Sequence, residues 1–328
     1  MFKVLGVYSA IGSLLYPAKQ LGWTIVGNIE PRKGFHSGTF ELNFPGIFKS
    51  EQLDTISLFH DTDIIIGLPT CRFYSQAGFQ FLSPEQRKNK RANFTEIENF
   101  QKAIKTIKPR MFIMENVPDF AKYHKFELND YKITQIVIAN CDYGNPQLRR
   151  RLWIVGHDET IKFNFLPAST GFQKLLSHVI KDLPCIDDIP EIQHVHRKPN
   201  DKLANIIPVI HGIDGKTYST VDEIAQYAMK FKTMSDMPYI NKNGEQKHRI
   251  GILRLDWNKR PRVLSVYDGL LHPETGYPLT IRERARIQGF PDTFKFIGTY
   301  QEQLIQTGAC VPLEFPTYLY KMIQEQNS

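Results

Sequence analysis

Short runs of β-branched and other apolar residues alternate with longer helical stretches through the first half of the chain, and this alternation restricts the fold most. The strand-like runs are residues 4–8, 24–29, 63–66, 111–114, 135–139 and 152–155. Between them lie segments such as 94–107, where apolar residues recur at helical spacing. This pattern predicts an α/β fold with a doubly wound, mostly parallel sheet covered by helices.

The candidate functional groups follow the ends of these predicted strands. The loop 6–12 follows the first run, Glu30 ends the second, Cys71 follows the third and Glu115 ends the fourth. Ligands of doubly wound sheets bind at the carboxyl ends of the strands. We therefore expect these groups to meet at one edge of the sheet.

Cys71 is the candidate nucleophile. A lone cysteine after a strand is usually a small buried hydrophobe. Here Pro69 and Gly67 interrupt the strand, and Arg72 supplies a cation that we expect to lower the thiol pKa. This context favours a reactive thiol.

Glu115 and the run Arg149-Arg150-Arg151 are the candidate acid and anion-binding groups. Either could be a solvated surface charge, and Glu115 could be a helix cap. A protonated Glu115 could instead donate to a pyrimidine ring nitrogen. Alternation along the following strand directs Arg149 and Arg151 to one side and Arg150 to the other. Two inward arginines suit a phosphate or a pyrimidine carbonyl.

The loop around residues 7–13 is a weak glycine-loop signal when taken alone. With Glu30 about 20 residues downstream at a strand end, it fits a nucleoside cofactor whose ribose binds an acid.

The size, net charge and cysteine content of the chain limit the partners, sites and locations to be expected. The chain has 328 residues and a net charge of +7, which suits a polyanionic partner without proving one. Its four cysteines show no paired metal spacing, so neither a disulfide framework nor a metal site is expected, and a reducing cytoplasm is the expected location. No apolar run is long enough for a membrane span.

The residue pattern changes in the second half of the chain. Residues 185–260 are rich in turn signals and predict a smaller, loop-rich domain. Helices are expected at 279–288, ended by Gly289, and at 311–324.

Together and in order, these segments resemble the DNA cytosine-C5 methyltransferase family over nearly the whole chain. The family's Pro-Pro-Cys-Gln loop with its following Phe-Ser stands here as Pro69-Thr70-Cys71-Arg72-Phe73-Tyr74-Ser75. Its other motifs correspond to Glu115-Asn116-Val117, to Gln147, Arg149 and Arg151, to Arg282, Glu283, Arg286, Gln288, Phe290, Pro291 and Asp292, and to Gly308 with Val311-Pro312.

The resemblance implies a DNA (cytosine-5) methyltransferase that uses S-adenosyl-L-methionine on a flipped-out cytosine. Cys71 would attack ring carbon 6, Glu115 would hold or protonate N3, Arg151 would contact the carbonyl oxygen, and Arg149 would support the loop or a phosphate. The implied cofactor-binding residues are Tyr8, Ser9, Ala10, Ile11, Gly12, Glu30, Pro69, Arg72, Ala309 and Val311. The implied substrate-binding residues are Ser75, Asn116, Val117 and Gln147.

The resemblance also implies a division of the chain. Residues 1–184 would form the catalytic and cofactor-binding domain, 185–297 the target recognition domain with its hinge, and 298–328 a segment returning to the catalytic domain. The implied partner is double-stranded DNA, bound by a monomer, with a cognate restriction endonuclease as a candidate companion.

Several positions depart from the family pattern. Family glycines become Ala10 and Ser13, the second proline becomes Thr70, the following glutamine becomes Arg72, and the last-motif asparagine becomes Ala309. Drift in a divergent member accounts for these changes. The alternative is a pocket that accepts carboxy-S-adenosyl-L-methionine and so makes 5-carboxymethylcytosine. A tRNA cytosine-C5 methyltransferase and an inert DNA-binding module remain further alternatives.

Overall fold

The computed structural model describes residues 1–32, 37–75, 83–85, 95–168, 171–183, 210–232, 236–241, 243–266 and 269–328. The chain divides into two compact units. Unit 1 comprises Met1–Gly144, Arg149–Phe172 and Val311–Ser328, and unit 2 comprises Asn145–Leu148 and Gln173–Cys310. The expected boundary at 184–185 lies outside the described residues.

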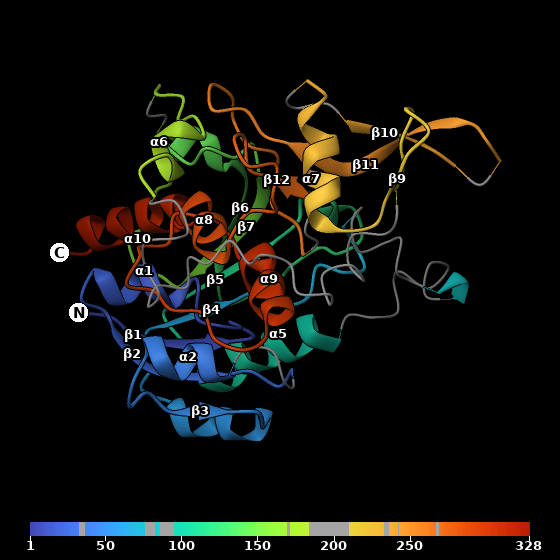
Figure 1. The fold of residues 1–328 in the computed structure, drawn as a ribbon. Coiled ribbons are helices and arrows are strands. Elements are labelled where there is room, and N and C mark those ends of the chain that lie inside the picture. The colour runs from blue at the N-terminus through green and yellow to red at the C-terminus, as the bar shows by residue number, and fades with distance from the viewer. Residues whose placement is uncertain are drawn as a thin grey trace. The chain divides into compact units, whose positions relative to one another are not determined.

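Unit 1 is built on a seven-stranded sheet (Figure 1). Its strands are β1 (Lys3–Val7), β2 (Thr24–Ile29), β3 (Lys49–Ser50), β4 (Ile64–Gly67), β5 (Met111–Asn116), β6 (Lys132–Ala139) and β7 (Arg150–His157). They lie in the order β3-β2-β1-β4-β5-β7-β6. The first five are parallel, whereas β7 runs antiparallel to both β5 and β6. The expected mostly parallel α/β sheet is confirmed.

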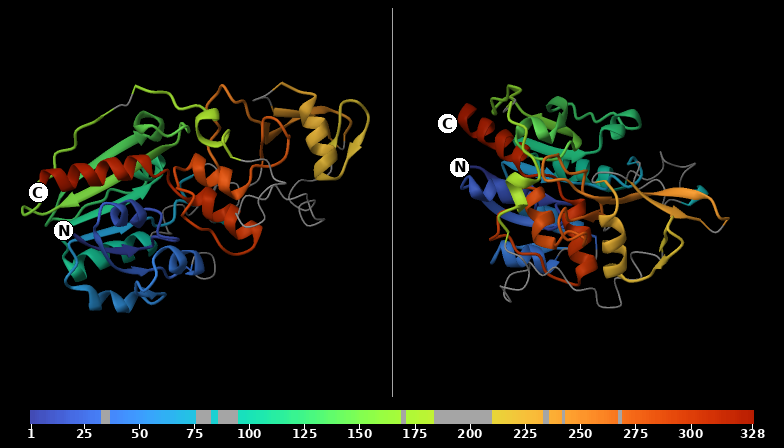
Figure 2. Two further views of the ribbon diagram at one scale, coloured as in Figure 1. Left: turned by 60° about the vertical axis from the view of Figure 1, so that its left-hand side comes forward. Right: turned by 45° about the horizontal axis from the view of Figure 1, so that its top comes forward.

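Helices cover both faces of this sheet (Figure 2). They are α1 (Leu15–Gln20), α2 (Ser37–Asn43), α5 (Thr95–Ile107) and α10 (Glu314–Gln326), with 3₁₀ turns η1 (Leu53–Phe59), η3 (Pro118–Lys122) and η4 (Asn140–Tyr143). The expected helix at 94–107 corresponds to α5, and the helix expected at 311–324 begins only at Glu314.

Alternation along β7 shows how its two faces are used. Leu152 and Ile154 join the apolar core that includes Phe100 and Ile104 of α5. Trp153 points to the other face, where its ring lies 4.9 Å from that of Phe315 in α10. Because side chains alternate across a strand, this register buries an apolar side chain on each face.

Unit 2 contains short strands and capped helices. Its elements are α6 (Ser177–Ile180), β8 (Ile210–His211), β9 (Thr217–Tyr218), α7 (Val221–Met229), β10 (Asp236–Ile240), β11 (Gln246–Arg254), β12 (Leu270–Leu271), α8 (Ile281–Ile287) and α9 (Tyr300–Ala309). Each of α7, α8 and α9 begins with a Thr-x-x-Glu capping box, which satisfies amide donors at the helix start. Between residues 210 and 260 the described part contains α7 and the strands β8 to β11, so it is more regular than the loop-rich region expected.

Within the described residues, no helix combines the length and the apolar character that crossing a membrane requires.

Candidate active site at the carboxyl edge of the sheet

The predicted groups of unit 1 meet at the carboxyl edge of its sheet. Val7 at the end of β1 pairs with Ile29 of β2 and Gly67 of β4, and Gly67 pairs with Met114 of β5. Strand β7 is antiparallel to β5, and the last pair of this register places Leu152 opposite Asn116, the final residue of β5. The arginines at the start of β7 therefore lie at the same edge as the end of β5.

The loop that carries Cys71 is held by backbone and side-chain hydrogen bonds. The amides of Tyr74 and Ser75 donate to the Cys71 carbonyl at 3.0 and 2.9 Å. Asn116 Nδ2 donates to the Pro69 carbonyl at 3.2 Å, which ties the end of β5 to the loop. The predicted substrate residue Asn116 thus supports the loop before the cysteine.

Burial raises the pKa of the Cys71 thiol, and the neighbouring Glu115 carboxylate raises it further. Arg151 and Arg149 oppose this rise in the pKa. Arg72 is exposed, and the causes of the shift are burial, Glu115, Arg151 and Arg149. The expectation that Arg72 lowers the thiol pKa was therefore wrong, because a solvated cation is screened from a buried sulfur.

Glu115 and Arg151 form a largely buried ion pair. Arg151 Nε lies 2.8 Å from Glu115 Oε1, and their side chains are 15% and 7% exposed. Burial raises the pKa of Glu115 even though Arg151 and Arg149 oppose the rise. A carboxyl with a raised pKa suits proton donation near neutral pH.

Arg149, Arg150 and Arg151 alternate in exposure, as the strand pattern predicted. Arg149 is buried, Arg150 is exposed and Arg151 is partly buried. The electrostatic influence of Arg149 on both Cys71 and Glu115 places its charge close to these two groups. The inward pair predicted from alternation is thus present.

The loop after β1 has a constrained backbone. Tyr8 and Ala10 have positive φ angles of 59° and 54°, and Gly12 has a φ of 80°. Left-handed backbone disfavours residues that carry a Cβ, so the alanine that replaces a family glycine is strained there. The Ala10 amide donates to Glu30 Oε2 at 2.6 Å, which fixes the loop beside the end of β2.

Arg32 covers the carboxylate of Glu30. Its Nε and its amide donate to Glu30 Oε1 at 2.6 and 3.1 Å, and its Nη2 donates to Oε2 at 2.6 Å. With the Ala10 amide, these contacts fill the four acceptor positions of the carboxylate. The strained loop and the buried acid fit a nucleoside cofactor, whose ribose hydroxyls would take acceptor positions that Arg32 now fills.

Arg32 and Glu96 were missed from the sequence. Glu96 Oε2 accepts the Thr70 amide at 2.7 Å and lies 4.0 Å from Arg32 Nη1. Proximity of Arg32 to Glu30 in the chain was a usable signal. Glu96 carried no comparable signal, because an acid in a first helical turn is common.

The remaining predicted residues vary in their surroundings. Ser9, Ile11, Pro69, Val117 and Val311 are buried in unit 1, and Ser75 is partly buried there.

Gln147 and Ala309 belong to unit 2. Gln147 is completely buried, where its amide group bonds to Ile287, Gln288 and Leu264. Ala309 is exposed at the end of α9.

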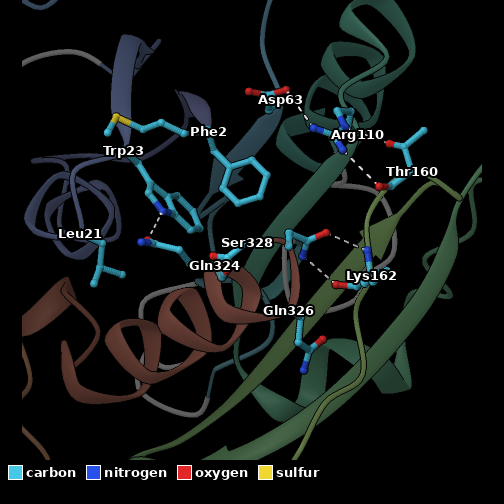
Figure 3. Close-up of a pocket in the computed structure, with 12 residues that line it drawn as sticks. Phe2, Leu21, Trp23, Asp63, Arg110, Thr160, Lys162, Gln324, Gln326 and Ser328 are labelled. Carbon is cyan, nitrogen blue, oxygen red and sulfur yellow. Dashed lines mark hydrogen bonds and ion pairs between the residues drawn. The ribbon is translucent and has the colours of Figure 1, made fainter.

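A cavity of about 580 Å³ opens at the other edge of the sheet, where β1, β4 and β5 begin (Figure 3). Its polar groups largely pair with one another: Arg110 Nη1 lies 3.7 Å from Asp63, and Trp23 Nε1 donates to Gln324. It lies away from the Cys71 loop, at the opposite ends of the strands. Among the described residues, no cluster of three or more His, Cys, Asp or Glu suits a metal ion.

Comparisons with known proteins relate the whole chain to one family. The family model of the C-5 cytosine-specific DNA methylases matches residues 2–325. The Type II methyltransferase M.DdeI of Desulfomicrobium norvegicum is 25% identical, covering 90% of this chain and 80% of its own. The Type II methyltransferase M.HgiDI of Herpetosiphon aurantiacus is also 25% identical, covering 98% and 94%.

Two solved structures are similar in fold to this chain. A protein described as a DNA modification methyltransferase encoded within a prophage (E. coli) has a TM-score of 0.70 at 19% identity, with 99% of each chain covered. Spodoptera frugiperda DNMT2 has a TM-score of 0.61 at 14% identity, covering 99% of this chain and 100% of its own.

Proposed function

Because this chain belongs to the family of C-5 cytosine-specific DNA methylases, we propose that it methylates carbon 5 of cytosine in duplex DNA through covalent catalysis by Cys71. One observation carries the proposal: the Cys71 loop, Glu115 and the inward arginines meet at one sheet edge. The Glu115–Arg151 pair gives this edge an acid with a raised pKa beside a thiol.

Cys71 is the proposed nucleophile. Its thiolate adds to carbon 6 of cytosine, so that a carbon–sulfur bond forms and the ring electrons move toward N3 and carbon 5. A base stacked in the duplex cannot be reached in this way, so the cytosine is flipped out of the helix. Since burial raises the thiol pKa, addition requires loss of the thiol proton to solvent as the base binds.

Glu115 is the proposed acid. Protonation of N3 by its carboxyl group neutralises the charge that thiolate addition delivers to the ring. Arg151 orients this carboxyl through its Nε, and its other N–H groups are suited to the pyrimidine carbonyl oxygen. Arg149 opposes the rise in the Cys71 pKa, which favours the thiolate form of the nucleophile.

Glu30 and the loop from Tyr8 to Gly12 are the proposed cofactor site. When bound there, S-adenosyl-L-methionine supplies an electrophilic methyl group. Release of Cys71 then requires loss of the carbon 5 proton to water and cleavage of the carbon–sulfur bond, which returns the thiolate, while the N3 proton returns to Glu115.

The family and the Type II methyltransferase relatives support duplex DNA as the substrate, within a restriction–modification system that includes a cognate endonuclease. We propose that the target is recognised by residues within 185–297 and that a monomer suffices for flipping one base.

Nucleoside mass spectrometry tests the proposal. The protein is incubated with duplex DNA or tRNA and with S-adenosyl-L-methionine or its carboxy derivative. We expect 5-methylcytosine in DNA with the first cofactor, and none from a Cys71→Ser variant. 5-Carboxymethylcytosine as the only product, modification of tRNA alone, or no product from any pair would each contradict it.

A further inference from the structure

Thr70 supplies a backbone donor that the family pattern lacks. Position 70 corresponds to the second proline of the family's Pro-Pro-Cys loop, and proline has no amide hydrogen. Here the Thr70 amide donates to Glu96 Oε2 at 2.7 Å, one residue before Cys71. The departure at residue 70 therefore creates a contact that the proline could not make.

Glu96 is placed to hold this loop from outside it. It lies in the first turn of α5, and its side chain is 22% exposed. Burial raises the pKa of Glu96, while Arg32 and the Thr70 amide oppose that rise. A hydrogen bond from a backbone amide to a carboxylate is stronger than one between neutral groups.

Arg32 links Glu96 to the proposed cofactor acid. Its guanidinium bonds to Glu30 and lies 4.0 Å from the same Glu96 oxygen that accepts the Thr70 amide. Arg32 also donates to the Tyr8 carbonyl at 2.9 Å. Glu30, Arg32, Glu96 and the Thr70 amide thus form a continuous chain of contacts at the carboxyl edge.

We propose that Glu96 is a positioning residue for the nucleophile: it holds the Cys71 loop through the Thr70 amide, and before the cofactor binds Arg32 anchors it to the cofactor site. This inference rests on the proposed function, in which Cys71 attacks cytosine. A simpler role for Glu96 is to stabilise the start of α5 through the helix dipole. The two roles differ in whether the Thr70 amide matters.

Hydrogen exchange at cytosine carbon 5 isolates the attack step without a cofactor. Addition of the Cys71 thiolate to carbon 6 leaves carbon 5 able to take a proton from water. When the original hydrogen leaves instead and the carbon–sulfur bond breaks, the base is restored. Duplex DNA with tritium at cytosine carbon 5 therefore releases tritium into water at a rate that reports Cys71 attack.

A double-mutant cycle tests the contact. Thr70→Pro removes the donor and Glu96→Ala removes the acceptor, while Thr70→Ala keeps the amide and is the matched control. We expect each of the first two variants to release tritium about tenfold more slowly, and Thr70→Ala to stay within about threefold of the parent. The combined variant should also be about tenfold slower, rather than about a hundredfold, because both changes break one contact.

Several results would overturn the inference. Parental release by Thr70→Pro, or independent losses that multiply in the combined variant, would mean that Glu96 does not act through the amide. If Thr70→Pro fails to melt cooperatively, tritium release by Glu96→Gln tests the contact instead. The side-chain oxygen of glutamine can still accept a hydrogen bond from the Thr70 amide. Glu96→Gln should stay within about threefold of the parent, and a loss as large as that of Glu96→Ala would contradict the inference.

The Cys71→Ser variant separates the two proposals. Tritium release at the parental rate from this variant would contradict the proposed function itself. Loss of release in Cys71→Ser with parental rates in Thr70→Pro and Glu96→Ala would contradict only the positioning role of Glu96.

Discussion

Replacement of Arg151 by glutamine should make the stability of the fold depend on pH through Glu115. In the native protein, Arg151 Nε pairs with Glu115 at 2.8 Å, and the carboxyl side chain is only 7% exposed. Removal of the cation leaves a buried carboxylate without its ionic partner, and the pKa of Glu115, already raised by burial, should rise further.

The size of the effect follows from the protonation of Glu115. The carboxyl can escape its buried charge by binding a proton, which limits the destabilisation. At pH 7, two and a half pH units above its ordinary pKa of 4.5, holding Glu115 neutral costs about 3.4 kcal/mol. The Arg151→Gln variant should therefore lose at most about 3.4 kcal/mol at pH 7 through this charge.

The sign of the pH dependence is fixed by where the proton is bound. The folded variant keeps a proton on Glu115 that the unfolded chain has released, so its stability falls as pH rises. The decrease in the free energy of unfolding relative to the parent should be absent below pH 4.5. It should grow above the parental Glu115 pKa by at most about 1.4 kcal/mol per pH unit.

Urea unfolding between pH 5 and pH 8 measures this difference. The matched control repeats the change in a Glu115→Gln background, where the effect of Arg151→Gln should be independent of pH. An equal loss of stability at pH 5 and pH 8 in the protein that retains Glu115 would mean that the charge of Glu115 does not cause the destabilisation.

Three further predictions concern the backbone and the thiol. Ala10→Gly should raise the free energy of unfolding by about 0.5 kcal/mol, because relief of a positive φ of 54° exceeds the added chain entropy; a lower urea midpoint would count against this. Gly308→Ala should destabilise unit 2 by about 3 kcal/mol, because the new Cβ would lie 2.1 Å from the Ser265 carbonyl oxygen; an unchanged thermal melt would show that the backbone yields. Iodoacetamide should label Cys71 slowly at pH 7 and faster as pH rises past 9.0, the ordinary thiol pKa; rapid labelling at pH 7 would contradict the raised pKa.

Local sequence patterns were enough to predict most strands of the sheet. The second predicted run, Thr24–Ile29, coincides with β2, because a short β-branched segment between polar residues favours a strand. Strand β7 was longer than the predicted 152–155, and its antiparallel direction was not predicted. Strand direction is set by pairing with distant segments, which a local pattern does not encode.

The candidate site was predicted in part for the same reason. The positions of Cys71 and Glu115 at strand ends follow from strand periodicity and from the rule that parallel strands end together. The contact between Glu96 and the Thr70 amide joins residues 26 apart in the chain, so no spacing rule reveals it. The direction of the thiol pKa shift was mispredicted from Arg72, because burial, which the sequence does not show, outweighs a nearby charge in the chain.

Covalent trapping with a modified base is a direct test of nucleophilic attack by Cys71. The protein is incubated with S-adenosyl-L-methionine and a duplex in which 5-fluorocytosine replaces cytosine, and the digested product is analysed by mass spectrometry. Fluorine on carbon 5 cannot leave as a proton does, so the carbon–sulfur bond should persist. We expect a stable adduct on the peptide that contains Cys71, whereas DNA methylation without an adduct, or an adduct on another residue, would contradict covalent catalysis by Cys71.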